Sequence, residues 1–467
     1  MRQVRRGERR QAVRKRCASG LAPMKNTVSR TFLFTLTAIA ALAPSLSFAA
    51  DGFFATGYGP RQRALAGASV ADGRDGMAAS VNPASIVGLD RQFAFGVAAN
   101  LAYRGYRTEG LPRLIAAGDV RSGRPWTPIP NSGNIRPIDA DSAWSFVTYS
   151  NGGINSAYDV RHARPPLGGP FGGGFVGLDL RQAFASVDYA RRFHTAIGPI
   201  TIGLAPTIAV QMLNVQGVKT FAPFSINQWE MSDMGFDWSY GGGFRLGLLW
   251  GITDSLRFGF SGSTPMWMSR FDKYSGLLGG QGSFDIPAQL QAGFAYDILP
   301  NLTLMADWRH VFYSAVPSLG NSNAPLFVRS LGDSAGINMK DTDSASFAAE
   351  WRATPTLALR LGYHYATSSL ISRSLNFAVL SPSVNRHHLG GGFNYAITKN
   401  SSFDFSVLWA FKNSVSAFEA IPQSAGRLFG GFNPAATINV WAYGGAFSVG
   451  YNYKFDQGDD SWFPTHF

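Results

Sequence analysis

Apolar and polar side chains alternate along much of the chain with a period of two residues. Ile200 and Ile202, for example, fall on one face of a short stretch, while Thr201 and Gly203 fall on the other. The same alternation is present in 200–212, 244–250, 256–260, 357–365, 403–411 and 443–455. A period of two is typical of β-strands whose two faces meet different surroundings. The pattern therefore predicts an all-β fold.

The second face of these predicted strands consists mainly of Gly, Ala, Ser, Asn and Arg. A soluble β-sandwich would instead turn many charged residues outward. Small residues suit the crowded interior of a barrel whose apolar face meets lipid, and aromatic residues near strand ends suit the membrane interfaces. The aromatic residues placed in this way are Trp250, Tyr296, Trp308, Trp351, Trp409 and Tyr453. We favour a transmembrane antiparallel β-barrel at 92–455 over a soluble all-β protein.

The predicted turns differ in length between the two ends of the barrel. The short turns are 194–199, 251–254, 298–301, 353–355 and 398–401. The long loops are about 107–141, 215–236, 269–285, 314–342, 368–385 and 414–438. Short periplasmic turns and long extracellular loops are typical of outer-membrane barrels. The turns delimit twelve strands, and a weaker pair at 142–150 and 154–162 would make about fourteen.

Composition supports the membrane assignment. Only 15% of the residues are charged, against about 25% in typical soluble domains. After residue 50, no apolar run reaches the roughly 18 residues that a membrane-spanning helix needs. We therefore expect the chain to cross the membrane with strands.

The first 49 residues are predicted to be a leader with a secretory signal peptide. They carry ten basic residues and one acid, so the net charge of +12 falls to +3 for the rest of the chain, and a nucleic-acid partner is not expected. Lys25 and Arg30 precede an apolar run at 31–46, and Ser47 to Ala49 form a small-x-small cleavage site. A single membrane anchor is the alternative, but Pro44 interrupts the short run. Translation could start at Met1 or Met24. The only cysteine, Cys17, lies in this leader.

Residues 51–91 do not alternate and contain two short helical patches, with Asp72 and Asp75 as candidate N-caps. Because this segment precedes the first predicted strand, it could be a linker or a plug inside the barrel.

Part of this segment resembles a known motif. The sequence 57–72 (GYGPRQRALAGASVAD), then Asp75, then Asn82–Ala84, looks like the N-terminal hatch of FadL-type outer-membrane transporters, the OmpP1/FadL/TodX family. The likeness continues through the hairpins from Trp238 to Lys412 and covers nearly all of the chain after the leader. The resemblance implies a monomeric fourteen-stranded barrel with the hatch, at 50–91, inside the lumen.

The resemblance also implies a function and its site residues. The family carries long-chain fatty acids and, in some relatives, aromatic hydrocarbons, by passive diffusion that the hatch gates. Ligand lands among the extracellular loops, reaches a pocket beside the mature N-terminus and leaves sideways at a kinked third strand. Gly57, Gly59, Asn82, Pro83 and Ala84 then belong to the gating hatch, while Phe53 and Phe54 lie near the pocket. Long-chain fatty acids are the first expected substrate and aromatic hydrocarbons the alternative.

Two features depart from the family pattern. The third strand, near 142–162, has weak alternation, and Pro165 and Pro166 follow it. The last strand ends at the aromatic Phe455, but a tail at 456–467 follows. Either Phe455 or Phe467 could serve as the terminal aromatic residue that barrel insertion favours.

An apolar landing site is predicted in two of the long loops. Apolar ligands need apolar contacts on an otherwise polar rim, and Met side chains adapt to ligands of varied shape. The candidate ligand-binding residues are Phe224, Trp229, Met231, Met234, Phe236, Trp238, Trp267 and Met268, with Phe221, Ile226, Met266, Leu277 and Leu278 beside them. These residues could equally pack the loops together or form the outer aromatic girdle.

Several arginines are candidates for pairing with a substrate carboxylate. Arg61, Arg63 and Arg104 could supply a charge-assisted hydrogen bond. The alternative is that lumen arginines pair with acids of the hatch and wall. Arg245, Arg257 and Arg360 fit this alternative best.

The chain shows little that indicates catalysis. The segment 259–262 (GFSG) is not a nucleophile elbow, and His387 and His388, as strand neighbours, point to opposite faces. We find no metal-ligand spacing or phosphate loop. We therefore predict no catalytic residues, no metal site and no cofactor. A structural or adhesin-like barrel and an outer-membrane lipid hydrolase remain alternative functions.

The expected surroundings follow from the predicted location in the outer membrane of a Gram-negative cell. A hydrophobic small molecule is the expected ligand. Outer-membrane lipid and lipopolysaccharide are the expected neighbours, and the barrel-assembly machinery is the expected partner during insertion.

Overall fold

The computed structural model describes residues 49–115, 117–124, 126–159, 170–171, 174–322, 330–370, 375–421 and 431–456. The predicted signal peptide and start codon, in residues 1–48, lie outside these residues, as does the tail from residue 457 onward. In the part of the chain that is described, no helix combines the length and the apolar character needed to cross a membrane.

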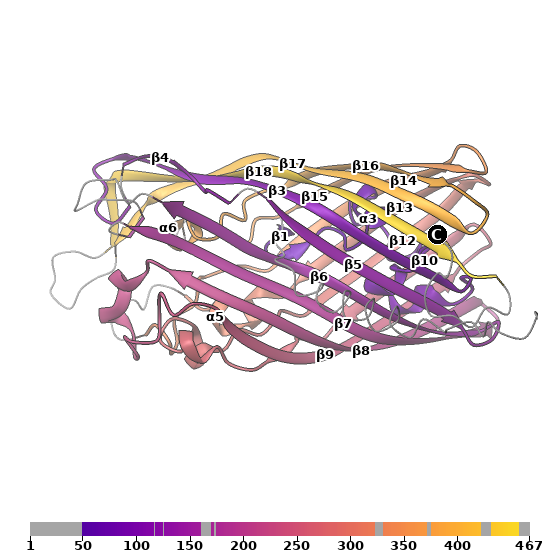
Figure 1. Ribbon diagram of the computed structural model, residues 1–467, viewed down its shortest axis with the longest axis horizontal. Helices are drawn as coiled ribbons and strands as arrows, with labels where there is room; N and C mark the ends of the chain where they lie inside the picture. Colours follow the sequence, from indigo (N-terminus) through magenta and orange to yellow (C-terminus); the bar gives the residue numbers. More distant parts are fainter. Residues whose placement is uncertain are drawn as a thin grey trace, which may run out of the picture. The chain divides into compact units, whose positions relative to one another are not determined.

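Fourteen strands form a closed antiparallel barrel (Figure 1). They are β3 (Gln92–Gly110), β5 (Trp126–Pro137), β6 (Ser142–Asp159), β7 (Phe175–Thr195), β8 (Gly198–Gln216), β9 (Asp237–Gly251), β10 (Leu256–Ser263), β12 (Gln289–Leu299), β13 (Leu302–Val311), β14 (Thr342–Arg352), β15 (Leu357–Ala366), β16 (His387–Ala396), β17 (Ser401–Ile421) and β18 (Gly431–Lys454). Each strand pairs with the next along the chain, and β18 pairs with β3 to close the ring. Two short strands, β4 (Gly118–Arg121) and β11 (Trp267–Met268), extend the sheet beside β3 and β9.

The alternating faces lie as the sequence predicts. Leu246 is 56% exposed on the outer wall, whereas its neighbour Arg245 is buried in the lumen. Tyr296, Trp308 and Trp351 also lie on the outer surface. An apolar outer wall around a polar interior is the inverse of a soluble barrel and suits a lipid surrounding.

Three details of the strand prediction are wrong. The weak pair 142–150 and 154–162 is, over the described residues 142–159, a single strand, β6, whose pairing with β7 shifts register between Ser150 and Gly153. The expected loop 107–141 contains β4 and β5. The expected loop 414–438 is mostly strand, because β17 and β18 continue into it as a long hairpin. In β6, the bulge inserts residues that break the period of two, so one strand reads as two.

The asymmetry of the turns is confirmed. Short connections join β7 to β8, β9 to β10, β12 to β13, β14 to β15 and β16 to β17, and residues 138–141 add a sixth between β5 and β6. The opposite end carries the long loops, with short helical turns inside them. These turns are η4 (Lys219–Phe224), η5 (Asp272–Tyr274), α4 (Gly279–Gly282), η6 (Tyr313–Ala315), α5 (Pro317–Gly320) and α6 (Leu375–Ala378).

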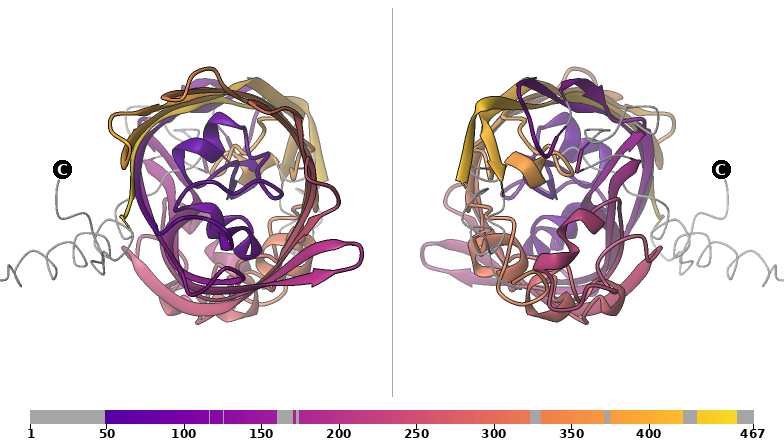
Figure 2. Two further views of the ribbon diagram at one scale, coloured as in Figure 1. Left: turned by 90° about the vertical axis from the view of Figure 1, so that its right-hand side faces the viewer. Right: turned by 90° about the vertical axis from the view of Figure 1, so that its left-hand side faces the viewer.

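The N-terminal segment lies inside the barrel, as Figure 2 shows in indigo. We call residues 52–90 the luminal segment. Its elements are β2 (Phe54–Ala55), which pairs with β1 (Ala49–Asp51), α3 (Pro60–Ala64), η2 (Ala78–Ser80) and η3 (Pro83–Ile86). Nearly all of its residues between Phe53 and Val87 are buried. Of the two alternatives left open by the sequence, a linker and a plug, this placement agrees with a plug.

Candidate functional site

The first residues of the luminal segment reach toward the long-loop end of the barrel. The backbone N–H of Phe53 donates to the hydroxyl of Tyr313 at 2.6 Å, and the two rings meet edge to face at 5.7 Å. Gly52 has a φ of +74° and its Cα lies against the Tyr313 ring, so a side chain there would be strained and would clash. Tyr313, in η6, therefore fixes the position of Phe53.

An apolar cavity of about 90 Å³ lies beside Phe53. It is lined by β6, β7 and β8 and by the long loops. Its lining residues are Phe53, Ile154, Leu178, Leu180, Leu213, Val215, Leu277, Leu278, Gly279, Phe284, Ser318, Leu331, Ala335, Gly336, Ile337, Phe377, Leu380 and Ser381. No charged side chain is among these described residues. The arrangement can hold an apolar molecule but offers no cation for a carboxylate.

The structure brings only part of the predicted ligand-binding set to this cavity. Phe53, Leu277 and Leu278 line it. Phe54 packs on Tyr313, while Phe224, Met231 and Met268 belong to or contact the apolar cluster around it.

The other predicted ligand contacts lie elsewhere. Trp229 is 87% exposed, and Met234, Trp238 and Trp267 are also exposed. Phe236 lies under the guanidinium of Arg181 at 4.9 Å. Apolar content alone marked these residues. One loop contributes both inward-facing and outward-facing side chains. The apolar content of its sequence therefore could not distinguish the residues near the cavity from those on the surface.

Sequence reasoning missed several residues of the cavity. Phe284 and Phe377, which line the cavity, were not singled out from the sequence, and neither was Tyr313, which binds the backbone of the lining residue Phe53. They lie in or beside long loops that lack any periodicity. The aromatic residues of all long loops, taken together, would have been the available signal.

Asn82 anchors the middle of the luminal segment to the wall. Its side-chain amide donates to the carbonyl of Val70 at 2.8 Å and to that of Leu248 at 3.0 Å, and its side-chain oxygen accepts from the N–H of Ala84. A Cβ added to Gly247 would lie 2.2 Å from the Asn82 side chain. This segment can approach β9 so closely because the facing wall position is glycine.

A network of buried ion pairs ties the luminal segment to the wall near the short turns. Arg61 contacts Asp72 at 2.7 Å and Glu350 of β14 at 2.9 Å. The other pairs are Arg74–Asp72, Arg74–Asp297, Arg74–Glu350, Arg257–Asp72, Arg257–Asp297, Arg352–Glu350, Arg360–Glu350 and Arg360–Asp404. The wall partners come from β10, β12, β14, β15 and β17, so the network spans more than a third of the ring.

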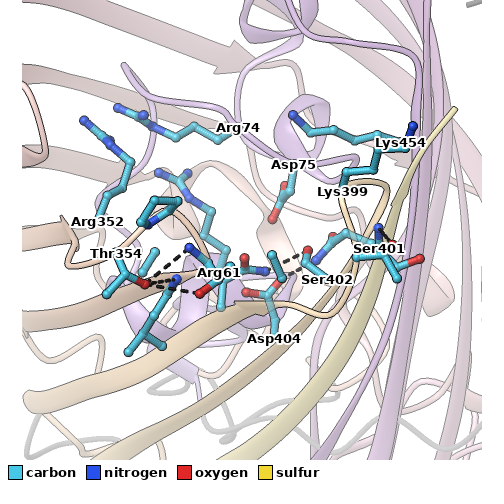
Figure 3. A pocket seen from close by; sticks show the side chains of 18 of the residues that line it. Arg61, Arg74, Asp75, Arg352, Thr354, Lys399, Ser401, Ser402, Asp404 and Lys454 are labelled. Atoms are coloured by element: carbon cyan, nitrogen blue, oxygen red, sulfur yellow. Dashed lines mark hydrogen bonds between the residues drawn. The ribbon is translucent and has the colours of Figure 1, made fainter. Parts of the chain in front are cut away.

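This network borders a polar cavity of about 670 Å³ at the short-turn end (Figure 3). Arg74, Arg352 and Asp404 are among its walls. Burial alone would raise the pKa of Asp72, but the guanidinium groups of Arg61 and Arg74 outweigh it and hold that pKa below its ordinary value. Burial raises the pKa of Asp75, and Arg61 offsets only part of this effect. The carboxylate of Asp72 is therefore held in its charged form.

The candidate carboxylate-binding arginines divide into different environments. Arg61 is fully engaged by Asp72 and Glu350, so it is not available to a ligand. Arg104 is buried among strand residues, and neither it nor Arg61 lines the apolar cavity. Arg63 points its guanidinium into another part of the lumen, next to Ser448.

The alternative interpretation, pairing with acids of hatch and wall, is confirmed for Arg257 and Arg360. For Arg245 it is wrong. Arg245 donates to the backbone carbonyl of Ala79 at 2.7 Å and lies over the ring of Tyr149 at 5.2 Å. Asp75, in line with the sequence, accepts from the N–H of Met77 just before η2, whereas Asp72 serves in the ion-pair network.

The wall has an interrupted seam between β5 and β6. Their ladder runs from Pro137↔Ala143 to Ser132↔Thr148, and the next contact described is Gly123 N–H to the carbonyl of Ala157. Between these points, residues 126–131 pair with β3 and residues 153–159 pair with β7. Prolines at 128 and 130 have no N–H to donate, which is typical of a strand edge.

The luminal segment contacts the wall beside this seam. The ring of Tyr58 packs on Tyr149 at 4.6 Å, and its hydroxyl lies 3.5 Å from the side-chain oxygen of Asn151, in the β6 bulge. Only four residues lie between Phe53 and Tyr58, so one short arm of the luminal segment joins the apolar cavity to the seam. We call residues 52–58 the N-terminal arm.

Comparison with known proteins shows which family has a matching sequence model. The model of the family described as outer membrane protein transport protein (OMPP1/FadL/TodX) matches residues 36–455. No curated protein matches the chain.

Solved structures share the fold. A Pseudomonas aeruginosa FadL homologue is 16% identical with a TM-score of 0.61, and the alignment covers 87% of this chain and 100% of that one. The P. putida toluene transporter TodX is 15% identical with a TM-score of 0.60, over 86% and 99% of the two chains. The Ralstonia pickettii toluene transporter TbuX is 19% identical with a TM-score of 0.53, over 86% and 99%.

Proposed function

The chain belongs to the OMPP1/FadL/TodX family of outer-membrane transport proteins, and from this premise we propose that it is a passive channel for small uncharged hydrophobic compounds. The family consists of outer-membrane β-barrel transporters of hydrophobic compounds, not of enzymes.

The proposed route begins in the apolar cavity and ends at the seam between β5 and β6. A hydrophobic compound leaves water for the cavity, because burial of its apolar surface is worth about 25 cal/mol per Å². It then moves along the N-terminal arm toward Tyr58 and Tyr149 and passes through the seam into the lipid. The observation that carries this proposal is that the interrupted part of the wall faces the arm that lines the cavity.

The proposed gate is the luminal segment, which we equate with the hatch at 50–91 expected from the sequence. Its body is fixed to the wall by the ion-pair network and by Asn82, whereas the arm is held by Tyr313, by ring contacts and by a hydrogen bond from Arg309 to the carbonyl of Ala55. Gly57 and Gly59 lie where the arm meets this fixed body. Motion of the arm therefore opens the cavity toward the seam without release of the body.

The cavity favours a compact, uncharged substrate over a long-chain fatty acid, which the sequence placed first. Its volume of about 90 Å³ is closer to the size of a single-ring compound than to that of a long-chain fatty acid, and the described lining offers no cation for a carboxylate. Two of the structural relatives are toluene transporters, which agrees with this choice, although the cavity lining is its basis.

A disulfide across the seam tests the route. Residues 50–467 contain no cysteine, so a Pro130→Cys, Ser150→Cys double variant introduces a defined pair at positions that would face each other if the ladder continued. We expect oxidation to abolish uptake of radiolabelled toluene by cells that lack their own transporters, and reduction to restore it.

The matched control is Ile135→Cys with Ser145→Cys, which bridges the same two strands where they are already paired. Oxidation of this control should leave uptake unchanged. Uptake that persists through the oxidised Pro130→Cys, Ser150→Cys seam would refute lateral exit.

A comparison of toluene uptake with oleate uptake tests the substrate class. The same cells should accumulate toluene at least several-fold faster with the protein than without it, while accumulation of oleate should change little. Faster accumulation of oleate alone would restore the fatty-acid prediction. No uptake of either, with the barrel correctly inserted, would favour the structural or adhesin-like alternative.

A further inference from the structure

A third and smaller cavity lies beside residues 55–57 of the N-terminal arm. Its volume is about 20 Å³, and it is lined by the arm, α3 and strands β3, β5, β16, β17 and β18. The lining residues are Ala55, Thr56, Gly57, Arg63, Asn100, Ile129, His388, Leu408, Ala410, Gly445 and Ala446. None of these residues lines the apolar cavity, so the two spaces are distinct.

Three of the polar side chains that line this cavity have unused hydrogen-bonding atoms. Both ring nitrogens of His388, the Nη2 atom of Arg63 and the hydroxyl of Thr56 have no hydrogen-bond partner among the described residues. Their residues are only 1%, 3% and 4% exposed. Buried polar atoms are almost always hydrogen-bonded, and each one left unsatisfied costs about 1–3 kcal/mol. Several such atoms around one space therefore indicate a bound polar species.

The charge of the surrounding side chains indicates whether the bound species is an anion or a cation. Among the described residues, the one side-chain hydrogen bond of Arg63 goes to the hydroxyl of Ser448 at 3.5 Å, and no carboxylate among them pairs with it. Arg61, two residues earlier, has both Asp72 and Glu350. Burial lowers the pKa of Arg63 to about 10 without a carboxylate to offset it.

The groups next to His388 are also neutral or cationic. The ring of His364 meets the ring of His388 at 5.5 Å, and Arg309 donates to the carbonyl of Ala55 in the arm. His387, its neighbour along β16, faces outward and is exposed. The guanidinium of Arg63 therefore carries a positive charge that no carboxylate of the described residues pairs with, and a buried charge without a partner is strongly destabilising.

We propose that this cavity binds one small monovalent anion of chloride size, which accepts hydrogen bonds from Arg63, Thr56 and His388. A cavity measured in this way needs about 10–15 Å³ to hold one water-sized particle, so 20 Å³ admits a halide but not a carboxylate with its carbon chain. Because Thr56 belongs to the N-terminal arm and His388 to the wall, the anion would hold the arm in place. Its binding would stabilise the folded protein in proportion to the logarithm of its concentration.

Thermal unfolding of the full-length protein in detergent micelles tests the proposal. Chloride is exchanged for gluconate at constant ionic strength, and we expect the Tm of the wild type to rise by about 2 °C for each tenfold increase in chloride. Bromide should act like chloride, whereas acetate should act like gluconate. The Arg63→Gln and His388→Asn variants should lose the dependence, and Arg63→Lys should keep part of it.

The control variant is Arg257→Gln, which removes another luminal arginine outside the cavity. It should lower the Tm but retain the full chloride dependence, because its partners are Asp72 and Asp297. If Arg63→Gln lowers the Tm and still responds to chloride as the wild type does, Arg63 has only a structural role and the proposal fails.

Crystals of the wild type grown in sodium bromide provide a direct readout that does not depend on any variant folding. We expect an anomalous bromide peak among Arg63, Thr56 and His388. An ordered water in place of that peak, together with a Tm that is independent of chloride, would overturn the proposal. Stabilisation by acetate equal to that by chloride would assign the site to carboxylates instead.

Discussion

At the residue scale, the arginines of the lumen show that a sequence identifies candidate ion-pairing residues but not their partners. Arg61 and Arg63 are two residues apart in one short helix, and both were expected to bind a carboxylate or to pair with an acid. Arg61 has two carboxylate partners and Arg63 has none among the described residues. The difference depends on where Glu350 falls across the lumen, nearly three hundred residues later, and no local pattern encodes that distance.

Substitution of Asp72 tests the ion-pair network. Its folded pKa lies below its ordinary value of about 3.9, so its ion pairs stabilise the protein fully above about pH 4, and this stabilisation is lost as the pH falls through the lower folded pKa. We expect Asp72→Asn to lower the free energy of unfolding by about 3 kcal/mol at pH 7, since it breaks a buried network. The loss of stability on acidification should then be smaller than in the wild type.

Denaturant unfolding in micelles at pH 7 and pH 3 measures both effects. Asp254→Asn, in an exposed short turn, serves as the control and should change neither value. Equal acid sensitivity of Asp72→Asn and the wild type would show that other carboxyl groups dominate the response.

At the element scale, the regular strands were predictable and the functional irregularities were not. Alternation identified most of β8 and β15 and the second half of β18, because nothing interrupts the period of two in these stretches. It missed β5, where prolines at 128 and 130 suggest a loop, and it divided β6 at the bulge near Ser150. These two strands border the seam. The prolines of β5 and the bulge of β6 interrupt the period of two in the sequence, and the same features interrupt the pairing of these strands at the seam.

Replacement of both prolines tests the origin of the seam. Pro128→Val with Pro130→Val restores two backbone N–H donors to β5, and valine favours strand structure. We expect the ladder between β5 and β6 to lengthen and uptake of toluene to fall several-fold, with the barrel still inserted. Pro199→Val, at the exposed start of β8, is the matched control. Unchanged uptake in the double variant would mean that the bulge in β6 alone maintains the opening.

At the scale of the whole molecule, the barrel and its contents form one packed unit. The fold class, the placement of short turns at one end and long loops at the other, and the position of the N-terminal segment could all be predicted. Length, alternation and the hatch-like motif constrain these features. The apolar cavity could not, since its walls combine two aromatic loop residues, Phe284 and Phe377, with strand residues brought together only by ring closure.

Removal of the luminal segment tests whether it blocks the lumen. We expect deletion of residues 57–88 to turn a nearly non-conducting barrel into an open pore, because a fourteen-stranded ring leaves space that side chains alone do not fill. Single-channel recording in planar bilayers measures the conductance. The Asn82→Ala variant, which keeps the segment, should conduct far less. A deletion variant that inserts but does not conduct would show that the strands collapse inward.

The ion-pair network also bears on the order in which the chain assembles. Arg61 and Arg74 precede every strand of the wall, yet their partners on the wall lie on β12 and β14, which follow much later along the chain. The network of ion pairs can therefore be complete only when the late strands that carry these carboxylates are in place. The joining of β18 to β3 encloses the luminal segment. Completion of the ion-pair network and closure of the wall thus both depend on the last strands of the chain.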